Sequence, residues 1–318
     1  MSGPAVRAGI LLPPRDVLPA LAAEIAAVLP AYAAELGGIE LLFAAPEGTP
    51  AERAAAARAF LEAEDVVALV ASFTDGADAE IAAVADAAEV PLLATLSSRP
   101  RNSIAPSRWV RDLCGGIVEQ SIALVRHVGA QRVALLHRDR EIAEAVARRV
   151  DGVHPIDAST ASLRDFDALL FAGPEAIPLG LFDETVRWPP LLFAGGAVPP
   201  SLFDRIRPDG GVWIALPTFA HDQSTAARGA YEDLIRRHGI PTGHRISQFA
   251  ALTSLGLFAD AARRCGGDVT RASLLRAVDD TRGFHSGLFP RLTYGAERRI
   301  GSTGAWVVGR NLDPVWID

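Results

Sequence analysis

The sequence predicts an α/β fold with two doubly wound parallel-sheet lobes. Short, continuously apolar runs alternate with alanine-rich stretches of helical periodicity, and this alternation occurs twice in succession along the chain. Continuous apolar strands between amphipathic helices are typical of a parallel sheet covered by helices on both faces. Two such series in one chain of 318 residues favour two lobes over a single large sheet.

The first series begins with the apolar run VRAGILL. Its expected strands lie at 6–12, 39–45, 66–71 and 91–95. Its expected helices lie around 17–35, 50–63 and 76–88. In the loop SFTDGADAEI, Thr74 or Asp75 would cap the third helix, and Asp78 and Glu80 would complement its dipole.

The second series leads into a late helix and a β-rich tail. Its expected strands lie at 132–137, 152–157, 167–173, 190–196 and 211–217, and its expected helices around 115–128, 140–150 and 178–187. A long helix over 223–238 is expected to stop at Gly239 and Pro241. The late helix, 247–267, would be capped by Ser247 and ended by Gly266.

Composition excludes several classes of function. The net charge is −7 and the basic residues are scattered, so no basic stripe marks a nucleic-acid interface. All 31 basic residues are arginine, which excludes a Schiff-base lysine or the lysine of a phosphate-binding P-loop. No apolar run reaches the roughly 18–20 residues of a membrane helix, so we expect no direct membrane insertion.

Motifs for catalysis or metal binding are missing from the sequence. The seven histidines form no H-x-x-x-H pair, and no G-x-S-x-G or G-x-G-x-x-G stands in a catalytic or dinucleotide-binding position. Cys114 and Cys265 are either two free thiols or one disulfide. We therefore expect no cofactor, no metal and no enzymatic activity.

Several stretches in this order resemble the type I periplasmic solute-binding proteins, specifically the branched-chain amino acid (Leu/Ile/Val) receptors of ABC transporters. The resemblance spans most of the chain. The stretches that carry it are VRAGILLPP, AEDVVALVASFTDGADAEIAAVADAAEVPLLATLSS, WVRDLCGGIVEQSIALVRHVGAQRVALLHRD and FHSGLFPRLTYGAERR.

This resemblance implies lobes joined by three crossing strands, as in the type I periplasmic-binding-protein fold. It places the first crossing near Trp109 and Val110, the second near 241–246 and the third near 288–291. The expected lobes are therefore 1–108 plus 242–288 for lobe 1 and 109–241 plus 289–318 for lobe 2, with a ligand cleft between them.

The resemblance also implies partners and a location. A small-molecule ligand would close the lobes, and a membrane permease of an ABC transporter would read the closed form. We expect a periplasmic protein if a leader peptide has been removed, and a cytoplasmic one if the chain is native as given. The alternative is a ligand-sensing regulator on the same fold that signals to a protein partner.

Candidate ligand-binding residues follow the carboxyl ends of the expected strands, where ligands sit in α/β sheets. They bring proline, phenylalanine and hydroxyl groups together with a few charges, which suits a small or medium organic ligand with a substantial apolar part. The candidates are Pro14, Phe73, Thr74, Asp75, Thr95, Ser97, Ser98, His137, Arg138, Phe219, His221 and Gln248.

Overall fold

The chain forms two compact units, each with its own sheet. The computed structural model describes residues 5–318 except 75, 95, 98–100, 157–162, 174–187, 196–210 and 310–312. Unit 1 contains residues 1–114 and 219–302, and unit 2 contains 115–218 and 303–318. The chain therefore passes between the units three times, near 114, 218 and 302, and the predicted fold class is confirmed.

Unit 1 is built on a parallel sheet of six strands. The strand order is β11-β5-β4-β3-β1-β2, and every pairing is parallel. The strands are β1 (Val6–Leu11), β2 (Ile39–Ala44), β3 (Ala68–Ala71), β4 (Leu92–Ala94), β5 (Val110–Cys114) and β11 (Ile300–Ser302).

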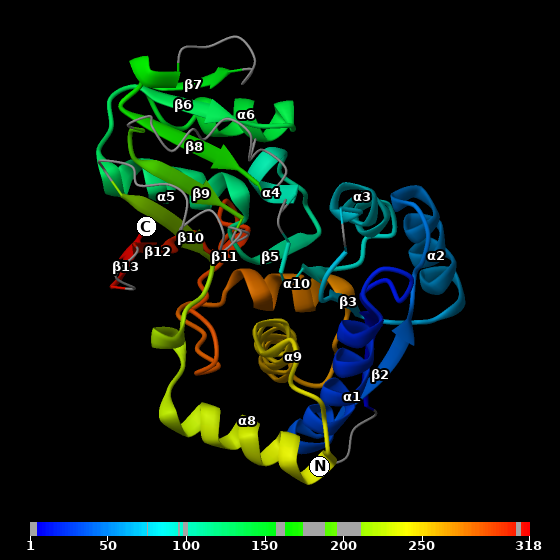
Figure 1. Ribbon diagram of the computed structural model, residues 1–318. Coiled ribbons are helices and arrows are strands. Elements are labelled where there is room, and N and C mark those ends of the chain that lie inside the picture. Colours follow the sequence, from blue (N-terminus) through cyan, green and yellow to red (C-terminus); the bar gives the residue numbers. More distant parts are fainter. Residues whose placement is uncertain are drawn as a thin grey trace. The chain divides into compact units, whose positions relative to one another are not determined.

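Helices cover both faces of this sheet (Figure 1). On one face lie α1 (Pro19–Leu36), α8 (Thr225–His238), α9 (Arg245–Cys265) and α10 (Arg271–Asp279), which share a core with Ile10 and Val70. On the other lie α2 (Pro50–Ala63) and α3 (Asp78–Ala87), which pack on Leu69 and Leu92. The short helix α4 (Arg101–Ile104) precedes β5. Alternate residues of β3 thus enter different cores, as the pleat of a strand requires.

Unit 2 is built on a seven-stranded mixed sheet. The order is β13-β12-β10-β9-β8-β6-β7, with β12 and β13 antiparallel to their neighbours. The strands are β6 (Val133–Leu136), β7 (Val153–Ile156), β8 (Ala168–Ala172), β9 (Leu191–Ala194), β10 (Val212–Leu216), β12 (Ala305–Gly309) and β13 (Pro314–Ile317). Among the residues that the structure describes in this unit, the helices are α5 (Ile117–Val128), α6 (Arg140–Ala147) and the 3-10 helix η1 (Leu163–Asp165).

The division into units differs from the expected lobe boundaries at all three crossings. Residues 219–241 belong to unit 1, because Tyr231 and Leu234 of α8 are buried in the core that α1 and α9 share. Residues 289–302 also belong to unit 1, where Phe289 is fully buried and β11 pairs with β5. The first crossing follows β5 rather than preceding it.

Local predictions were right for most helices and wrong at some ends. The stop at Gly239 is confirmed, since this residue has φ 62° and its N–H caps α8. Gly266 likewise ends α9. Ser247 lies inside α9 rather than capping it, and α10 was not predicted. The expected helix over 178–187 lies outside the described residues.

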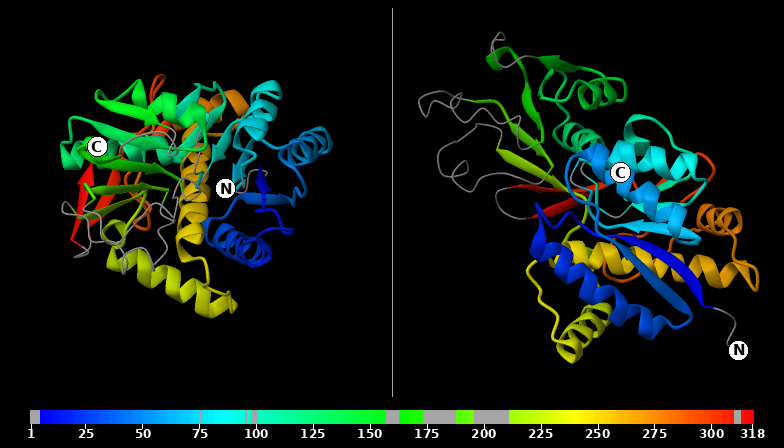
Figure 2. Two further views of the ribbon diagram at one scale, coloured as in Figure 1. Left: turned by 45° about the horizontal axis from the view of Figure 1, so that its top comes forward. Right: turned by 90° about the vertical axis from the view of Figure 1, so that its right-hand side faces the viewer.

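Helix α1 meets the length and apolar composition of a membrane-spanning helix, contrary to the expectation that no stretch would. Only this helix does so among the described residues, and core helices of folded proteins pass the same test. Its residues Ile25, Val28 and Leu29 are fully buried, and α1 packs side by side with α9 (Figures 1 and 2). In this structure α1 is therefore a core helix of unit 1.

Candidate ligand-binding site

Both sheets have a topological switch point, where ligands bind in open α/β folds. In unit 1 the order β2-β1-β3-β4-β5 reverses direction between β1 and β3. In unit 2 the order β7-β6-β8-β9-β10 reverses between β6 and β8. The loops that follow these four strands are therefore the candidate ligand-binding loops, and each unit has its own pair.

The loop after β1 is stiff and tied down. Pro14 is buried, and its carbonyl oxygen accepts hydrogen bonds from the N–H groups of Val17 and Leu18 at 3.3 and 2.8 Å. Asp16 accepts a hydrogen bond from the N–H of Gly48, which ties this loop to the one after β2 at 3.0 Å. Pro14 is therefore a rigid, buried position of this loop that has no N–H donor.

The loop after β3 is organised by charged side chains. The Thr74 hydroxyl donates to a carboxylate oxygen of Asp78 at 2.6 Å, and the buried Arg53 of α2 donates to the Thr74 carbonyl at 3.2 Å. The residue that caps α3 is Ala77, so the prediction that Thr74 would cap is wrong, while Asp78 and Glu80 do lie in the first turn. Since its proton goes to Asp78, the Thr74 hydroxyl can only accept a hydrogen bond from another group.

Neighbouring candidates in unit 1 take different places. Phe73 is half-buried and packs against the core under α9. Ser97 is half-buried and already has an interaction partner. The remaining three candidates of this edge lie outside the described residues: Asp75, Thr95 and Ser98.

The loop after β6 supplies the candidates of unit 2. His137 is half-buried, and its Nδ1 atom is buried with no hydrogen-bond partner among the described residues. Arg138 is exposed. Asp139, the next residue, caps α6 by accepting from the N–H groups of Glu141 and Ile142 at 3.0 and 3.3 Å.

Two glycines at this edge were missed by the sequence reasoning. Gly173 and Gly195 directly follow β8 and β9 and have φ of 102° and 94°. A Cβ atom on Gly195 would lie 3.4 Å from both Gly173 and Ile117, so the start of α5 approaches the two strand ends closely. Gln120 of α5 accepts a hydrogen bond from the Gly195 N–H at 2.7 Å. The signal was present as glycine after apolar runs in FAG and FAGG.

Phe219 and His221 lie together after β10. Their rings stack with centroids 5.6 Å apart, and the Phe219 N–H donates to Asp222 at 2.8 Å. His221 is exposed and Phe219 half-buried. Both fall in unit 1 rather than in the second lobe expected for them, because the chain returns to unit 1 after Thr218.

Gln248 is built into the core of unit 1. It is fully buried, its amide N–H groups donate to Glu24 at 2.6 Å and to the Pro241 carbonyl at 2.8 Å, and its oxygen accepts from the Tyr231 hydroxyl at 2.8 Å. Glu24 also accepts from the N–H groups of Gly243 and His244, both at 3.0 Å. These bonds place Gln248 in a buried network that joins α1, α8, α9 and the loop between α8 and α9.

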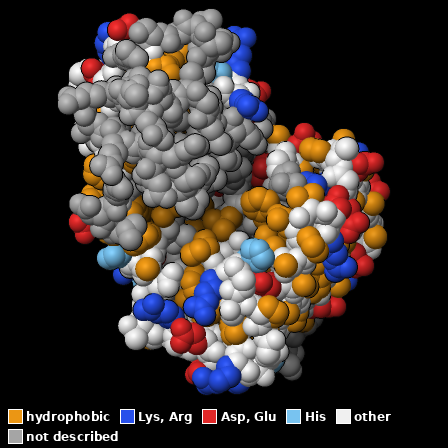
Figure 3. Space-filling view, viewed as in Figure 1, with side chains coloured by type: hydrophobic (Ala, Val, Ile, Leu, Met, Phe, Trp, Pro, Cys, Tyr) orange, Lys and Arg blue, Asp and Glu red, His pale blue; other side chains and the backbone are white. Residues whose placement is uncertain are grey.

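The described part of the chain has no metal-binding cluster and no disulfide. No three His, Cys, Asp or Glu side chains converge there in a way that could hold a metal ion. Cys114 and Cys265 are both free thiols. Charged side chains of both signs are interspersed over the described surface drawn in Figure 3.

The comparisons with known proteins show which fold the chain has. No protein-family model matches the chain, and no curated protein matches it. Among solved structures, an ABC transporter substrate-binding protein from Desulfitobacterium hafniense has a TM-score of 0.71 at 17% identity, with 98% of this chain and 100% of that chain covered.

Two further structures have bound amino acids. One, a complex with Leu from the same organism, has a TM-score of 0.68 at 15% identity, covering 98% and 100% of the two chains. The other, a branched-chain amino acid ABC transporter structure from Thermus thermophilus with bound valine, has a TM-score of 0.66 at 15% identity, covering 100% and 96%. The chain therefore has the fold of these substrate-binding proteins over its whole length, and the resemblance expected from the sequence is confirmed for the fold.

Proposed function

We propose that the protein is a solute-binding protein of an ABC importer-type system, which captures a small or medium organic ligand with a substantial apolar part. The observation that carries the proposal is the matched pair of switch points, one in each unit, on a fold shared with substrate-binding proteins. The ligand would bind in a cleft between the lobes, against the loops after β1 and β3 on one side and after β6 and β8 on the other.

The proposed mechanism is binding without turnover. A ligand that contacts both lobes only in the closed form shifts the population toward closure by its difference in affinity for the two forms. A membrane permease would recognise that closed form, with the protein located in the periplasm. The solved neighbours named as transporter components support this reading over a sensor.

The chemistry of the loop after β3 supports a ligand without a free carboxylate at this point. Asp78 and Glu80 are negative and would repel a carboxylate. The Thr74 hydroxyl donates to Asp78, so it has no proton with which to bind a ligand carboxylate. Arg53 brings one positive charge, but its guanidinium already holds the Thr74 carbonyl. The half-buried Phe73 adds apolar surface. Such a half-site favours an apolar body with a neutral or donor group.

A thermal-shift screen tests this proposal. We expect aromatic, fatty or terpenoid compounds to raise the melting temperature, and free amino acids to leave it unchanged. Stabilisation by leucine or valine alone would keep the solute-binding function and contradict the ligand class. No stabilisation by any organic solute, together with nothing released from the purified protein for mass spectrometry, would contradict the function itself.

A further inference from the structure

Strand β2 is an open edge of the unit 1 sheet (Figure 1). It pairs with β1 on one side, and no described strand pairs with it on the other. None of its six residues is buried, whereas every residue of β11, the strand at the opposite edge, is buried. Strand β2 therefore presents a row of backbone groups to solvent.

The register of the β1–β2 ladder shows which backbone groups of β2 are open. The N–H groups of Val6 and Leu12 donate to the carbonyl oxygens of residues 38 and 44, both at 2.9 Å. Since a parallel ladder engages alternate residues of a strand, residues 40, 42 and 44 are the ones that bond to β1. The outward N–H and carbonyl groups, which have no partner among the described residues, belong to Ile39, Leu41 and Phe43.

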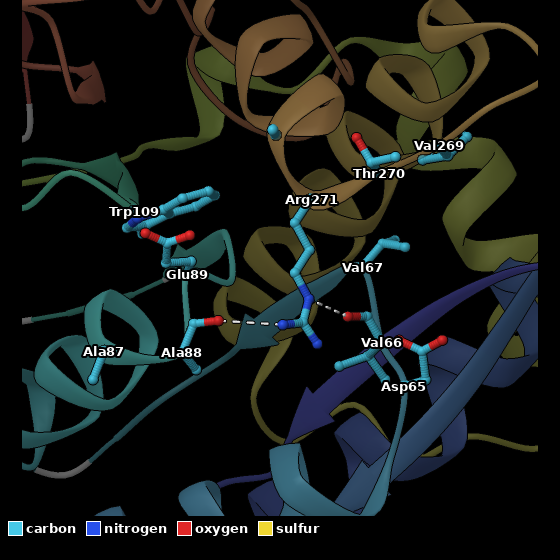
Figure 4. Close-up of a pocket in the computed structure, with 11 residues that line it drawn as sticks. Asp65, Val66, Val67, Ala87, Ala88, Glu89, Trp109, Val269, Thr270 and Arg271 are labelled. Carbon is cyan, nitrogen blue, oxygen red and sulfur yellow. Dashed lines mark hydrogen bonds between the residues drawn. The ribbon is translucent and has the colours of Figure 1, made fainter.

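Backbone groups at the amino-terminal end of the same sheet are bonded by arginine side chains of the chain itself. In the pocket of about 720 Å³ drawn in Figure 4, Arg271 donates to the carbonyl oxygens of Val66 and Ala88 at 3.1 and 3.2 Å. Arg7 donates to the Asp65 carbonyl oxygen at 3.1 Å. No described side chain bonds to the outward groups of β2 in this way, so these groups are left to water or to another chain.

Strand β2 lacks features that commonly keep an edge strand from pairing. It has no proline, whereas the two edge strands of the unit 2 sheet, β7 and β13, contain Pro155 and Pro314. Its one charged residue, Glu40, is in an ion pair with Arg7 at 3.4 Å, so its charge is partly neutralised within the chain. Phe43 is a large apolar side chain that is 38% exposed. These features favour pairing of this edge with another strand.

The sequence of β2 is complementary to a second copy of itself. In an antiparallel pair with a two-fold axis at Leu41, this residue faces its own copy, and Ile39 faces Phe43 of the second copy. Each such pair exchanges two hydrogen bonds, so the outward groups of both strands are satisfied by about six bonds. An aromatic ring opposite a β-branched side chain is a favourable cross-strand pair. Glu40 faces Leu42 of the second copy, so no two like charges lie directly opposite each other.

We propose that β2 is a homodimer interface, in which two copies of the chain join their six-stranded unit 1 sheets edge to edge into one continuous sheet. The contact is isologous, with the same strand on both sides of a two-fold axis. It does not depend on the proposed solute-binding function. A six-residue edge should bury less than the roughly 1,200 Å² of a standard-size interface, so we expect a weak dimer that forms at high protein concentration.

Sedimentation equilibrium over a range of protein concentrations tests the interface. We expect a reversible monomer–dimer equilibrium with a dissociation constant on the order of 100 µM. Hydrogen–deuterium exchange at high and low protein concentration locates the contact, since the backbone amides of Ile39, Leu41 and Phe43 should exchange more slowly in the dimer. Monomer alone at a concentration about tenfold above this constant, or a dimer in which these amides exchange as in the monomer, would overturn the proposal.

The decisive variant is Phe43→Pro. The Phe43 N–H points away from β1, so proline removes an edge donor without breaking a bond of the β1–β2 ladder. We expect about tenfold weaker dimerisation of this variant, and also of Phe43→Lys, which puts a charge on the edge. The control is Val17→Lys, because Val17 is an exposed apolar residue outside the strands, and it should dimerise as the parent does. Unchanged dimerisation of both Phe43 variants, with unchanged circular dichroism spectra, would contradict the interface.

Discussion

At the scale of single residues, Glu24 shows how a buried charge can organise a fold. Its carboxylate is 5% exposed and accepts hydrogen bonds from Gln248 and from two consecutive backbone N–H groups, and it also contacts the His244 ring at 3.1 Å. Burial raises the pKa of Glu24, but the hydrogen bonds from Gln248 and His244 outweigh burial and leave the pKa below its ordinary value. The ionised form is therefore the one that the fold stabilises.

Replacing Glu24 should weaken the protein in a pH-dependent way. We expect Glu24→Gln to lower the free energy of unfolding at pH 7 by about 1–3 kcal/mol, because charged hydrogen bonds are lost from a buried site. Since the folded pKa is lowered, the contribution of Glu24 is present above its unfolded pKa and is lost as the pH falls through the folded pKa. The variant should therefore lose less stability than the parent on acidification below about pH 4.5.

Urea unfolding at pH 7 and at pH 3.5 measures both effects. Glu232→Gln, an exposed carboxylate on α8, is the control and should change neither value. An equal stability loss on acidification in Glu24→Gln and in the parent would contradict this role of Glu24.

At the scale of elements, the strand ends of unit 2 depend on glycine. Gly195 has φ 94°, and a Cβ atom added to it would contact Gly173 and Ile117. Gly229, in the middle of α8, has open space around it and a helical backbone. The same substitution should therefore have opposite effects at these two positions.

We expect Gly195→Ala to destabilise the protein by about 1–3 kcal/mol, since alanine is strained at this φ. Gly229→Ala should stabilise it by about 0.5–1 kcal/mol, because glycine is a poor helix former. Thermal unfolding of both variants measures the difference. A Gly195→Ala variant as stable as the parent would contradict the positive φ that the structure gives this residue.

The elements could be predicted from the sequence where the signal is local. Apolar runs such as VRAGIL and ALLFA are continuous because both faces of each sheet are covered, and they mark β1 and β8. The destination of α8 could not be predicted, because Tyr231 and Leu234 pack on helices far away in the sequence. The segment between β10 and α8 has no local feature that tells a crossing from an ordinary loop.

The candidate site, like the elements, could be predicted from the sequence only in part. Strand ends locate Pro14, Thr74 and His137 at the carboxyl edges of the sheets, because the edge follows from strand direction alone. The hydrogen-bond and packing partners of these three side chains do not follow from strand direction. Gln248 was a candidate only by its place at the start of a helix, and its bond to Glu24 joins residues 224 positions apart.

At the scale of the whole molecule, the proposed function requires one ligand that engages both units. Each unit has its own core and its own switch point, and three chain crossings link them. A molecule that bound only one switch point would give no reason for lobe closure.

Hydrogen–deuterium exchange tests this requirement, with the screened compound that raises the melting temperature most. We expect slower exchange of backbone amides at 72–74 in unit 1 and at 137–139 in unit 2 at the same compound concentration. Protection of only one of these loops would contradict the proposed function.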